Sequence, residues 1–131
     1  WNTLNGKSNI ENIMNNILLN ERYNDISDMI KDVINDFKNN KYKTIKDASL
    51  SYGQTCPIKN GIKVILYALL LNGDDYKKGI LGIIESGGDN TSRALVYGSI
   101  VGSIYGDKCI PKEWINKAFN ANDALKTWKS V

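Results

Sequence analysis

Residues 87–93, Gly-Gly-Asp-Asn-Thr-Ser-Arg, hold the side chains best suited to chemistry in this 131-residue chain. Two glycines followed by an aspartate are typical of a turn that ends one helix and begins the next. The first turn of the second helix would present free N–H groups and a positive dipole end, which attract a phosphate or a carboxylate. Asp89, Thr91 and Ser92 add oxygen ligands of the kind that Mg²⁺ and Ca²⁺ prefer. The segment therefore predicts an anion or metal site at a helix N-terminus.

A purely structural interpretation of the same segment stays open. Asp89 can serve as an ordinary N-cap, and Asp89 and Arg93 have the spacing of an i, i+4 ion pair. Arg93 is still informative, because the chain has only two arginines among its 17 basic residues. A guanidinium can pair with a phosphate through two parallel hydrogen bonds without any metal ion.

Composition removes several classes of chemistry. The chain has no His, which excludes Ser-His-Asp and Cys-His catalysis and metal sites with His ligands. Cys56 and Cys109 cannot form a disulfide framework or a four-thiolate zinc site by themselves, and we expect both to be buried small hydrophobic residues. A net charge of +3 is too small to indicate nucleic-acid binding. The length and the 42% hydrophobic content fit one domain over residues 1–131.

Apolar residues recur at helical spacing along the chain, and no period-two strand pattern interrupts them. Thr44 and Asp47 have the spacing of an N-terminal cap. Helices are expected over residues 9–20, 26–37, 45–50, 58–71, 76–85, 94–106 and 111–119, with a further one after Asn122. The sequence thus predicts an all-α fold, a compact multi-helix orthogonal bundle of seven or eight helices, in which Trp114 and Trp128 pack between helices.

Small residues recur every four positions in the helix expected over 94–106, at Ala94, Gly98, Gly102 and Gly106. Such a groove lets another helix approach closely. Tyr97 and Tyr105 flank it, either packing against neighbours or lining a pocket. The apolar run Ala94–Tyr105 has 12 residues, short of the roughly 20 that span a bilayer, so no membrane contact is expected. The N-terminus lacks the pattern of a signal peptide, which favours a cytoplasmic protein.

Several of these pieces occur together in one known family. Gly87-Gly88-Asp89, the small-residue helix and Ile110-Pro111-Lys112-Glu113-Trp114 resemble, in order and spacing, the C-terminal part of the ADP-ribosylglycohydrolases. This family includes the dinitrogenase reductase-activating glycohydrolases and the J1 crystallins. One branch is similar to Gly-Gly-Asp-Asn-x-x-Arg preceded by Gly-Gln-x-Cys, and Gly53-Gln54-Thr55-Cys56 has that second pattern. The resemblance covers about half of the chain, from Tyr52 to Trp114.

The resemblance implies an all-α domain that removes ADP-ribose from protein side chains or related acceptors with the help of two Mg²⁺ ions. Asp89 falls on the first C-terminal metal aspartate of the family, and Ser92 falls on its last Thr ligand. The implied metal ligands are therefore Asp89, Thr91 and Ser92. The implied substrate-binding residues are Gly87, Gly88, Asn90 and Arg93. No catalytic residue is assigned.

Two departures from the family pattern bear on the metal. Thr91 stands where the second metal aspartate belongs, and Arg93 adds a positive charge within one turn, so the local charge moves two units away from what two dications need. Family members also carry a Thr-x-Asp metal motif earlier in a longer domain. The aspartates on or beside the helix expected over 26–37 do not supply it, and we expect them to form a solvated face: Asp25, Asp28, Asp32 and Asp36.

Three functions follow. The first is an ADP-ribosylglycohydrolase-like chain, a fragment or shortened form with an incomplete binuclear magnesium site, which is inactive as this chain and at most binds ADP-ribose or a nucleotide. The second is an active Mg²⁺-dependent ADP-ribosyl hydrolase of N- or O-glycosidic bonds, completed by upstream residues or a partner. The third is a non-enzymatic helical interaction module, in which a homodimer or a partner helix covers exposed apolar faces.

Overall fold

The computed structural model describes residues 8–19, 24–54, 58–120, 123 and 126–127, and this part of the chain contains helices and no strand. The expected all-α fold is therefore confirmed. The elements are α1 (Ser8–Leu18), α2 (Asn24–Lys38), α3 (Ile45–Tyr52), α4 (Ile58–Asn72), α5 (Tyr76–Glu85), α6 (Asn90–Tyr105), the 3-10 helix η2 (Asp107–Cys109) and α7 (Lys112–Lys117). Cys56, Trp128 and most of the helix expected after Asn122 lie outside the described residues.

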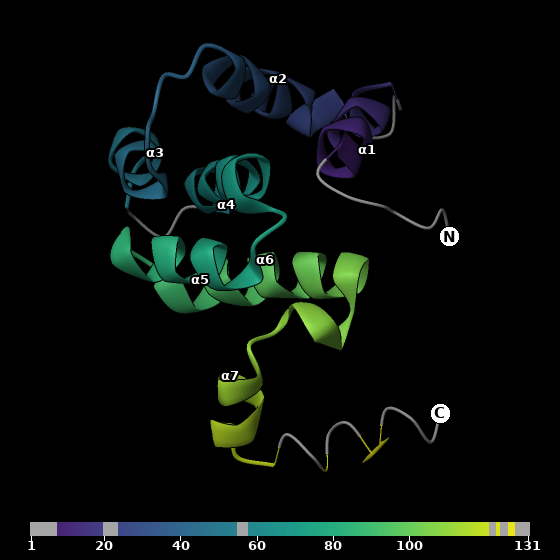
Figure 1. Cartoon of the computed structure of the whole chain (residues 1–131). Helices are drawn as coiled ribbons and strands as arrows, with labels where there is room; N and C mark the ends of the chain where they lie inside the picture. Colours follow the sequence, from purple (N-terminus) through teal and green to yellow (C-terminus); the bar gives the residue numbers. More distant parts are fainter. Residues whose placement is uncertain (1–7, 20–23, 55–57, 121–122, 124–125, 128–131) are drawn as a thin grey trace.

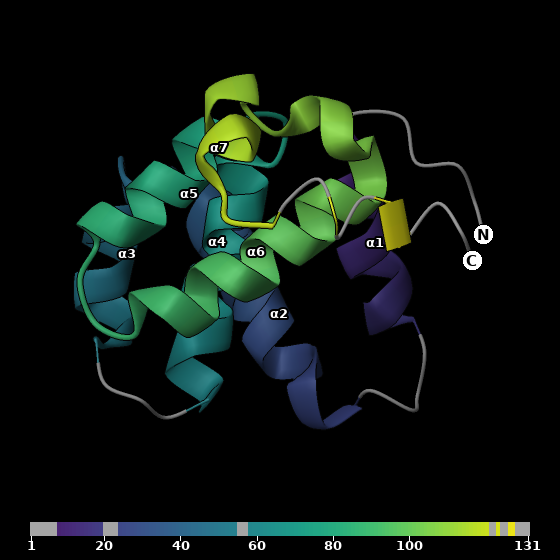
Figure 2. The ribbon, with the colours of Figure 1, turned by 90° about the horizontal axis from the view of Figure 1, so that it is seen from below.

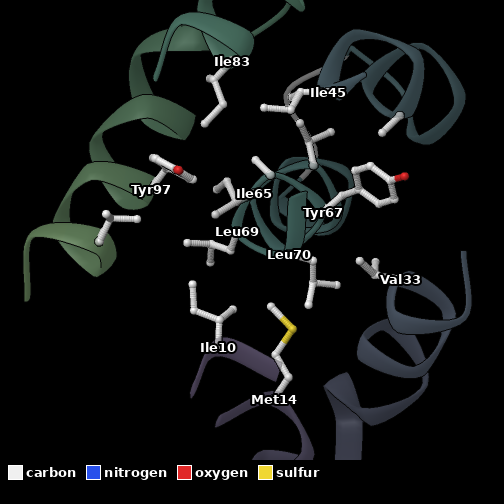
Figure 3. Packing of buried hydrophobic residues seen from close by; sticks show 14 of the residues in the cluster. Ile10, Met14, Val33, Ile45, Ile65, Tyr67, Leu69, Leu70, Ile83 and Tyr97 are labelled. Atoms are coloured by element: carbon white, nitrogen blue, oxygen red, sulfur yellow. The ribbon is translucent and has the colours of Figure 1, made fainter. Parts of the chain in front are cut away.

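Helix α4 occupies the centre of the molecule (Figure 1), with α1, α2 and α3 on one side of it and α5 and α6 on the other. Its sequence is apolar around most of its circumference, which is the pattern of a helix buried on all sides. Val64 and Ala68 are fully buried. Figure 3 shows side chains from the surrounding helices converging on α4, among them Ile10, Met14, Val33, Ile45, Ile83 and Tyr97. One core thus joins the helices from α1 to α6.

Helices α5 and α6 cross closely at Tyr97. The Tyr97 side chain is fully buried, and its hydroxyl donates a hydrogen bond of 2.6 Å to the carbonyl of Asn72 at the end of α4. A Cβ atom at Gly79 of α5 would overlap the Tyr97 ring, so this glycine is what allows the two helices to meet. Tyr97 is therefore a packing residue, the first of the two roles expected for it.

The small-residue groove of α6 is used at only one of its glycines. A Cβ atom at Gly98 would lie 2.9 Å from the Tyr76 hydroxyl of α5, so the expected close approach is confirmed there. Among the described residues, no atom outside the helix's own backbone lies within 4 Å of the Cβ position of Gly102 or Gly106. Half of the groove therefore faces no described neighbour.

Most helix boundaries differ from expectation by one or two residues, and for two of them the structure shows the cause. Helix α6 begins at Asn90, four residues before the apolar pattern starts, because Asp89 caps it. Helix α7 ends at Lys117, since Ala118 has an extended conformation with ψ 125°, and Phe119 is 94% exposed instead of lying on the helix. Trp114 packs between helices as expected, with its ring centroid 6.3 Å from that of Tyr76.

Tyr105 is the last residue of α6, and Cys109 is the last residue of η2, which follows it. Both are half-buried and pack against the core. The Cys109 thiol lies 3.0 Å from the carbonyl oxygen of Gly106, and burial raises the pKa of this thiol. Cys109 was expected to be a buried small hydrophobic residue. It is half-buried, and its raised pKa keeps the thiol in the neutral form.

Candidate functional site

The segment predicted to carry chemistry forms the turn between α5 and α6. Gly87 and Gly88 have φ angles of 75° and 80°, the left-handed region that glycine adopts without a Cβ penalty. Asp89 is the N-cap of α6, and its Oδ1 accepts a hydrogen bond from the Ser92 backbone N–H at 3.3 Å. The Asn90 side chain donates back to the Ile84 carbonyl at 2.9 Å, which fastens the turn to α5. The N-cap interpretation of Asp89 is thus confirmed.

Two of the motifs that carry the family resemblance touch each other, although Gln54 and Gly87 are 33 positions apart in the sequence. The Gln54 side-chain amide donates a 2.6 Å hydrogen bond to the Ser86 carbonyl. A Cβ atom at Gly87 would lie 2.7 Å from Gln54 Nε2, and one at Gly88 would lie 2.5 Å from the Gln54 carbonyl oxygen. Glycine is therefore required at both positions for two reasons: the backbone has positive φ angles there, and Gln54 lies too close for a Cβ atom. Sequence reasoning placed Gln54 in a motif but gave it no role.

Arg93 points into the protein. It is 2% exposed, and its Nη1 donates to Ser49 Oγ at 3.1 Å and to the Gly87 carbonyl at 3.3 Å. Its Nη2 donates to the Gly53 carbonyl at 3.2 Å. The ion pair considered between Arg93 and Asp89 is not formed, because the guanidinium turns away from the cap toward these three acceptors.

The acceptors of Arg93 explain how a buried cation is tolerated there. Gly53 is the C-cap of α3, and Gly87 follows the C-cap of α5. The guanidinium therefore sits at the C-terminal ends of two helices, where the dipoles and the last carbonyl groups are negative. Ser49, Gly53 and Gly87 were not foreseen as partners, since they come from segments up to 44 residues away.

The expected metal ligands do not fit two magnesium ions. Asp89 is half-buried and supplies one carboxylate, while Thr91 and Ser92 are exposed hydroxyl residues. The Arg93 guanidinium adds a fixed positive charge next to the turn, with Nη1 3.2 Å from the Cβ position of Gly88. Among the described residues, no group of three or more His, Cys, Asp or Glu side chains could hold a metal ion. Two dications need more negative charge than this turn provides.

The aspartates of α2 do not all form a solvated face. The side chains of Asp28 and Asp32 are 95% and 63% exposed, as expected, whereas that of Asp25 is outside the described side chains. The expectation is wrong for Asp36, whose side chain is 13% exposed. Lys41 and the Tyr52 hydroxyl each donate to Asp36 at 2.9 Å, and they bring the carboxylate under the loop before α3.

The hydrogen bonds to Asp36 control its protonation. Burial works to raise the pKa of the Asp36 carboxyl, but the bonds from Lys41 and Tyr52 outweigh burial and hold the pKa below its ordinary value of 3.8. Burial and the nearby Asp36 carboxylate raise the pKa of the Tyr52 hydroxyl. Asp36 is thus a structural carboxylate that stays ionised. It lines a hollow of about 350 Å³ beside Lys63 and Tyr42.

Comparison with known proteins identifies the family of this helical chain. The ADP-ribosylglycohydrolase family profile matches residues 2–128. The chain belongs to this family. Crystallin J1A of Tripedalia cystophora is 32% identical over 80 residues, which cover 61% of this chain and 24% of that protein. Crystallin J1B of the same organism is 29% identical over 80 residues, with the same coverage. No solved structure gives a significant match.

The chain spans about a quarter of the length of these curated relatives. None of the described helices has the length and apolar character needed to cross a bilayer.

Proposed function

We propose that this chain is a non-hydrolysing member of the ADP-ribosylglycohydrolase family that binds ADP-ribose or a related nucleotide weakly and without magnesium at the N-terminus of α6. Family membership supplies the ligand class. The observation that carries the proposal is the buried Arg93 guanidinium behind a turn that offers a single carboxylate. A fixed cation there favours phosphate and disfavours a second metal ion.

The residues of the turn between α5 and α6 would have different roles in binding the nucleotide. In the first turn of α6 the Asn90 and Ser92 N–H groups already donate to the Gly88 carbonyl and to Asp89 Oδ1. A phosphate would therefore compete for the Ser92 N–H, and the Thr91 N–H and the exposed Thr91 and Ser92 hydroxyls would be its further hydrogen-bond partners. Gly87 and Gly88 would let a ligand approach the backbone. Arg93 would not touch the ligand. Its buried guanidinium would position the turn by donating a hydrogen bond to the Gly87 carbonyl, and it would add positive electrostatic potential at the binding site.

Asp89 limits how tightly an anion can bind. Its carboxylate caps the same helix end that would receive the phosphate, so it competes for the Ser92 N–H and repels negative charge. Asp89→Asn keeps a capping side chain and removes the charge. We therefore expect this variant to bind ADP-ribose several-fold more tightly than the native chain.

Calorimetric titration of ADP-ribose, with Mg²⁺ and with EDTA, tests this proposal. Weak binding of equal strength in both conditions is expected, and it should tighten in Asp89→Asn. Asp107→Asn is the matched control, because Asp107 is an exposed aspartate at the other end of α6. No heat in either condition would remove the binding claim. Release of ADP-ribose from a modified protein by this chain would overturn the claim that it does not hydrolyse.

A second candidate, hydrolysis by a completed domain, is favoured by one observation. The chain spans only 24% of the length of Crystallin J1A, so a relative of full length has room for further ligands. In such a domain Asp89, Thr91 and Ser92 would be the residues of this chain nearest to Mg²⁺, whose chemistry there would be polarisation of water or ribose oxygens. ADP-ribose release that requires both an added upstream segment and Mg²⁺ would support this candidate.

A further inference from the structure

A hollow of about 540 Å³ lies between the start of α3, the end of α4 and one side of α5, away from the N-terminus of α6. Helices α3 and α5 lie next to each other at one edge of the molecule (Figure 2). We call this space the α3–α5 hollow, and Ile45, Leu71, Asn72, Leu81 and Glu85 are among the residues that line it. Pockets that hold small molecules have volumes of about 300–1,000 Å³, so the hollow has the size of a ligand site.

Asn72 lines this hollow with a side chain that lacks a partner. The residue is only 6% exposed. Among the described residues, nothing hydrogen-bonds to the Asn72 side-chain amide, since the bonds from the Tyr97 hydroxyl and the Asp75 N–H both go to its backbone carbonyl. A buried amide without a partner is costly, because its donor and its acceptor have given up hydrogen bonds to water. A ligand in the hollow that completes these hydrogen bonds would account for Asn72.

Charge around the α3–α5 hollow does not favour an anion. The charged residues that line it are Lys43, Lys77, Lys78, Asp75 and Glu85. Lys77 is paired with Glu113 of α7 at 2.9 Å, so the other lining charges are two positive and two negative. The adjacent Asp47 and Asp74, against Lys46, make the surroundings slightly negative. Asn72 also ends α4, where the helix dipole is negative, so an uncharged ligand with a hydrogen-bond donor suits the hollow better than a phosphate.

The Asn72 amide indicates the kind of ligand. Its oxygen accepts and its nitrogen donates, so it pairs with a group that has one donor and one acceptor on the same edge. The amino group of adenine and the neighbouring ring nitrogen form such an edge, and asparagine contacts adenine through both atoms when proteins read DNA. Ile45, Leu71 and Leu81 supply apolar surface for a flat ring. Glu85 is the last residue of α5, at the end away from Asn72, and its carboxylate can accept hydrogen bonds from ribose hydroxyls.

We propose that the α3–α5 hollow binds an adenine nucleoside, with the base on Asn72 and the ribose toward Glu85. This site is separate from the N-terminus of α6. It does not rest on nucleotide binding there, because adenosine carries no phosphate.

Titration of the isotope-labelled chain with adenosine, followed by amide NMR spectra, tests the site. The backbone amides of Asn72, Leu81 and Gly82 should shift and saturate, while those of Gly87 and Gly88 should stay in place. Purine riboside, which lacks the amino group, should bind several-fold more weakly, and ribose alone should cause no shift at the hollow. No saturable shift with adenosine, or shifts confined to the turn between α5 and α6, would overturn the proposal.

Asn72→Leu removes the amide and keeps a side chain of similar size. Adenosine should bind at least about tenfold more weakly, because a two-atom contact to adenine is lost. The variant should be no less stable to urea, since the Asn72 amide bonds to no described neighbour. Asn35→Leu is the matched control, at an exposed asparagine of α2 that lines the other hollow, and its adenosine affinity should equal that of the native chain. Adenosine binding of native strength in Asn72→Leu, or a marked loss of its stability, would overturn the proposal.

Glu85→Ala tests where the ribose lies. Adenosine should bind this variant several-fold more weakly, whereas free adenine, which has no ribose, should bind it as it binds the native chain. Equal losses for adenine and adenosine would overturn the placement of the ribose. Asp89→Asn, which changes the N-terminus of α6, should leave adenosine binding unchanged. Failure of ADP-ribose to bind at α6 and failure of adenosine to bind in the α3–α5 hollow are therefore distinguishable results.

Discussion

Arg93 shows how a single residue can join distant parts of a chain. Its guanidinium has no carboxylate partner among the described residues, yet it reaches the ends of α3 and α5 from the first turn of α6. An unpaired buried charge is expensive, and here helix ends and a serine hydroxyl compensate for it. The geometry of these acceptors requires a planar group with several N–H donors, which lysine does not have.

Arg93→Lys should therefore be costly. A lysine ammonium cannot reach Ser49, Gly53 and Gly87 at once, so at least one buried acceptor loses its partner while a buried charge remains. We expect a loss of about 2–4 kcal/mol in the free energy of unfolding, measured by urea denaturation. Lys46→Met, at an exposed position of α3, should change it by less than about 0.5 kcal/mol. Equal losses in the two variants would show that Arg93 has no special role.

The Asp36 carboxyl makes stability depend on pH. Its folded-state pKa lies below the ordinary value of 3.8, so its contribution is present above that pH and disappears as pH falls through the folded-state pKa. Asp36→Asn should reduce stability at pH 7 and flatten its decline between pH 5 and pH 3, as measured by urea denaturation at each pH. Asp28→Asn, at a 95% exposed side chain, should leave the decline unchanged.

At the scale of elements, the turn between α5 and α6 depends on its glycine pair. Gly88→Ala would require an alanine with a φ angle of 80° and a Cβ atom 2.5 Å from the Gln54 carbonyl oxygen. We expect it to cost about 2 kcal/mol or more, seen as a lower melting temperature. Gly102→Ala, in the last turn of α6 and with no atom of a described neighbour within 4 Å of the added Cβ, should instead raise stability by up to about 1 kcal/mol. The opposite signs distinguish a strained turn from a general effect of adding a methyl group.

Helices were predictable from sequence where apolar spacing and caps agree. Helix α5 has the expected bounds, and the Thr44–Asp47 cap forms a capping box before α3. Helix α6 begins at Asn90, before the expected start at residue 94, because its first turn is polar and the spacing of apolar residues cannot predict a polar turn. The local sequence pattern could not predict that the Arg93 side chain points into the protein or that the Asp36 side chain is buried. Each depends on partners brought close only when α3, α4 and α5 have packed.

The whole molecule is arranged around α4, which contacts α1, α2, α3, α5 and α6. A helix with neighbours on every side couples their stabilities, because no neighbour can leave without exposing its apolar surface. The aromatic residues of the α2–α4 side reinforce this, as the buried Tyr67 hydroxyl donates to the Tyr42 carbonyl in the loop before α3. The described helices should therefore unfold together.

Val64→Ala tests this coupling at the centre of α4, where Val64 is fully buried. Loss of two methyl groups should cost roughly 2 kcal/mol and lower the melting temperature by several degrees. Far-ultraviolet and near-ultraviolet circular dichroism should report the same shifted transition, since the helices and the tyrosine cluster depend on one core. Two separate transitions would show instead that α1 and α2 leave before α5 and α6. Leu50→Ala, at an exposed position, should leave the melting curve nearly unchanged, so that a shift in Val64→Ala can be assigned to the cavity in α4.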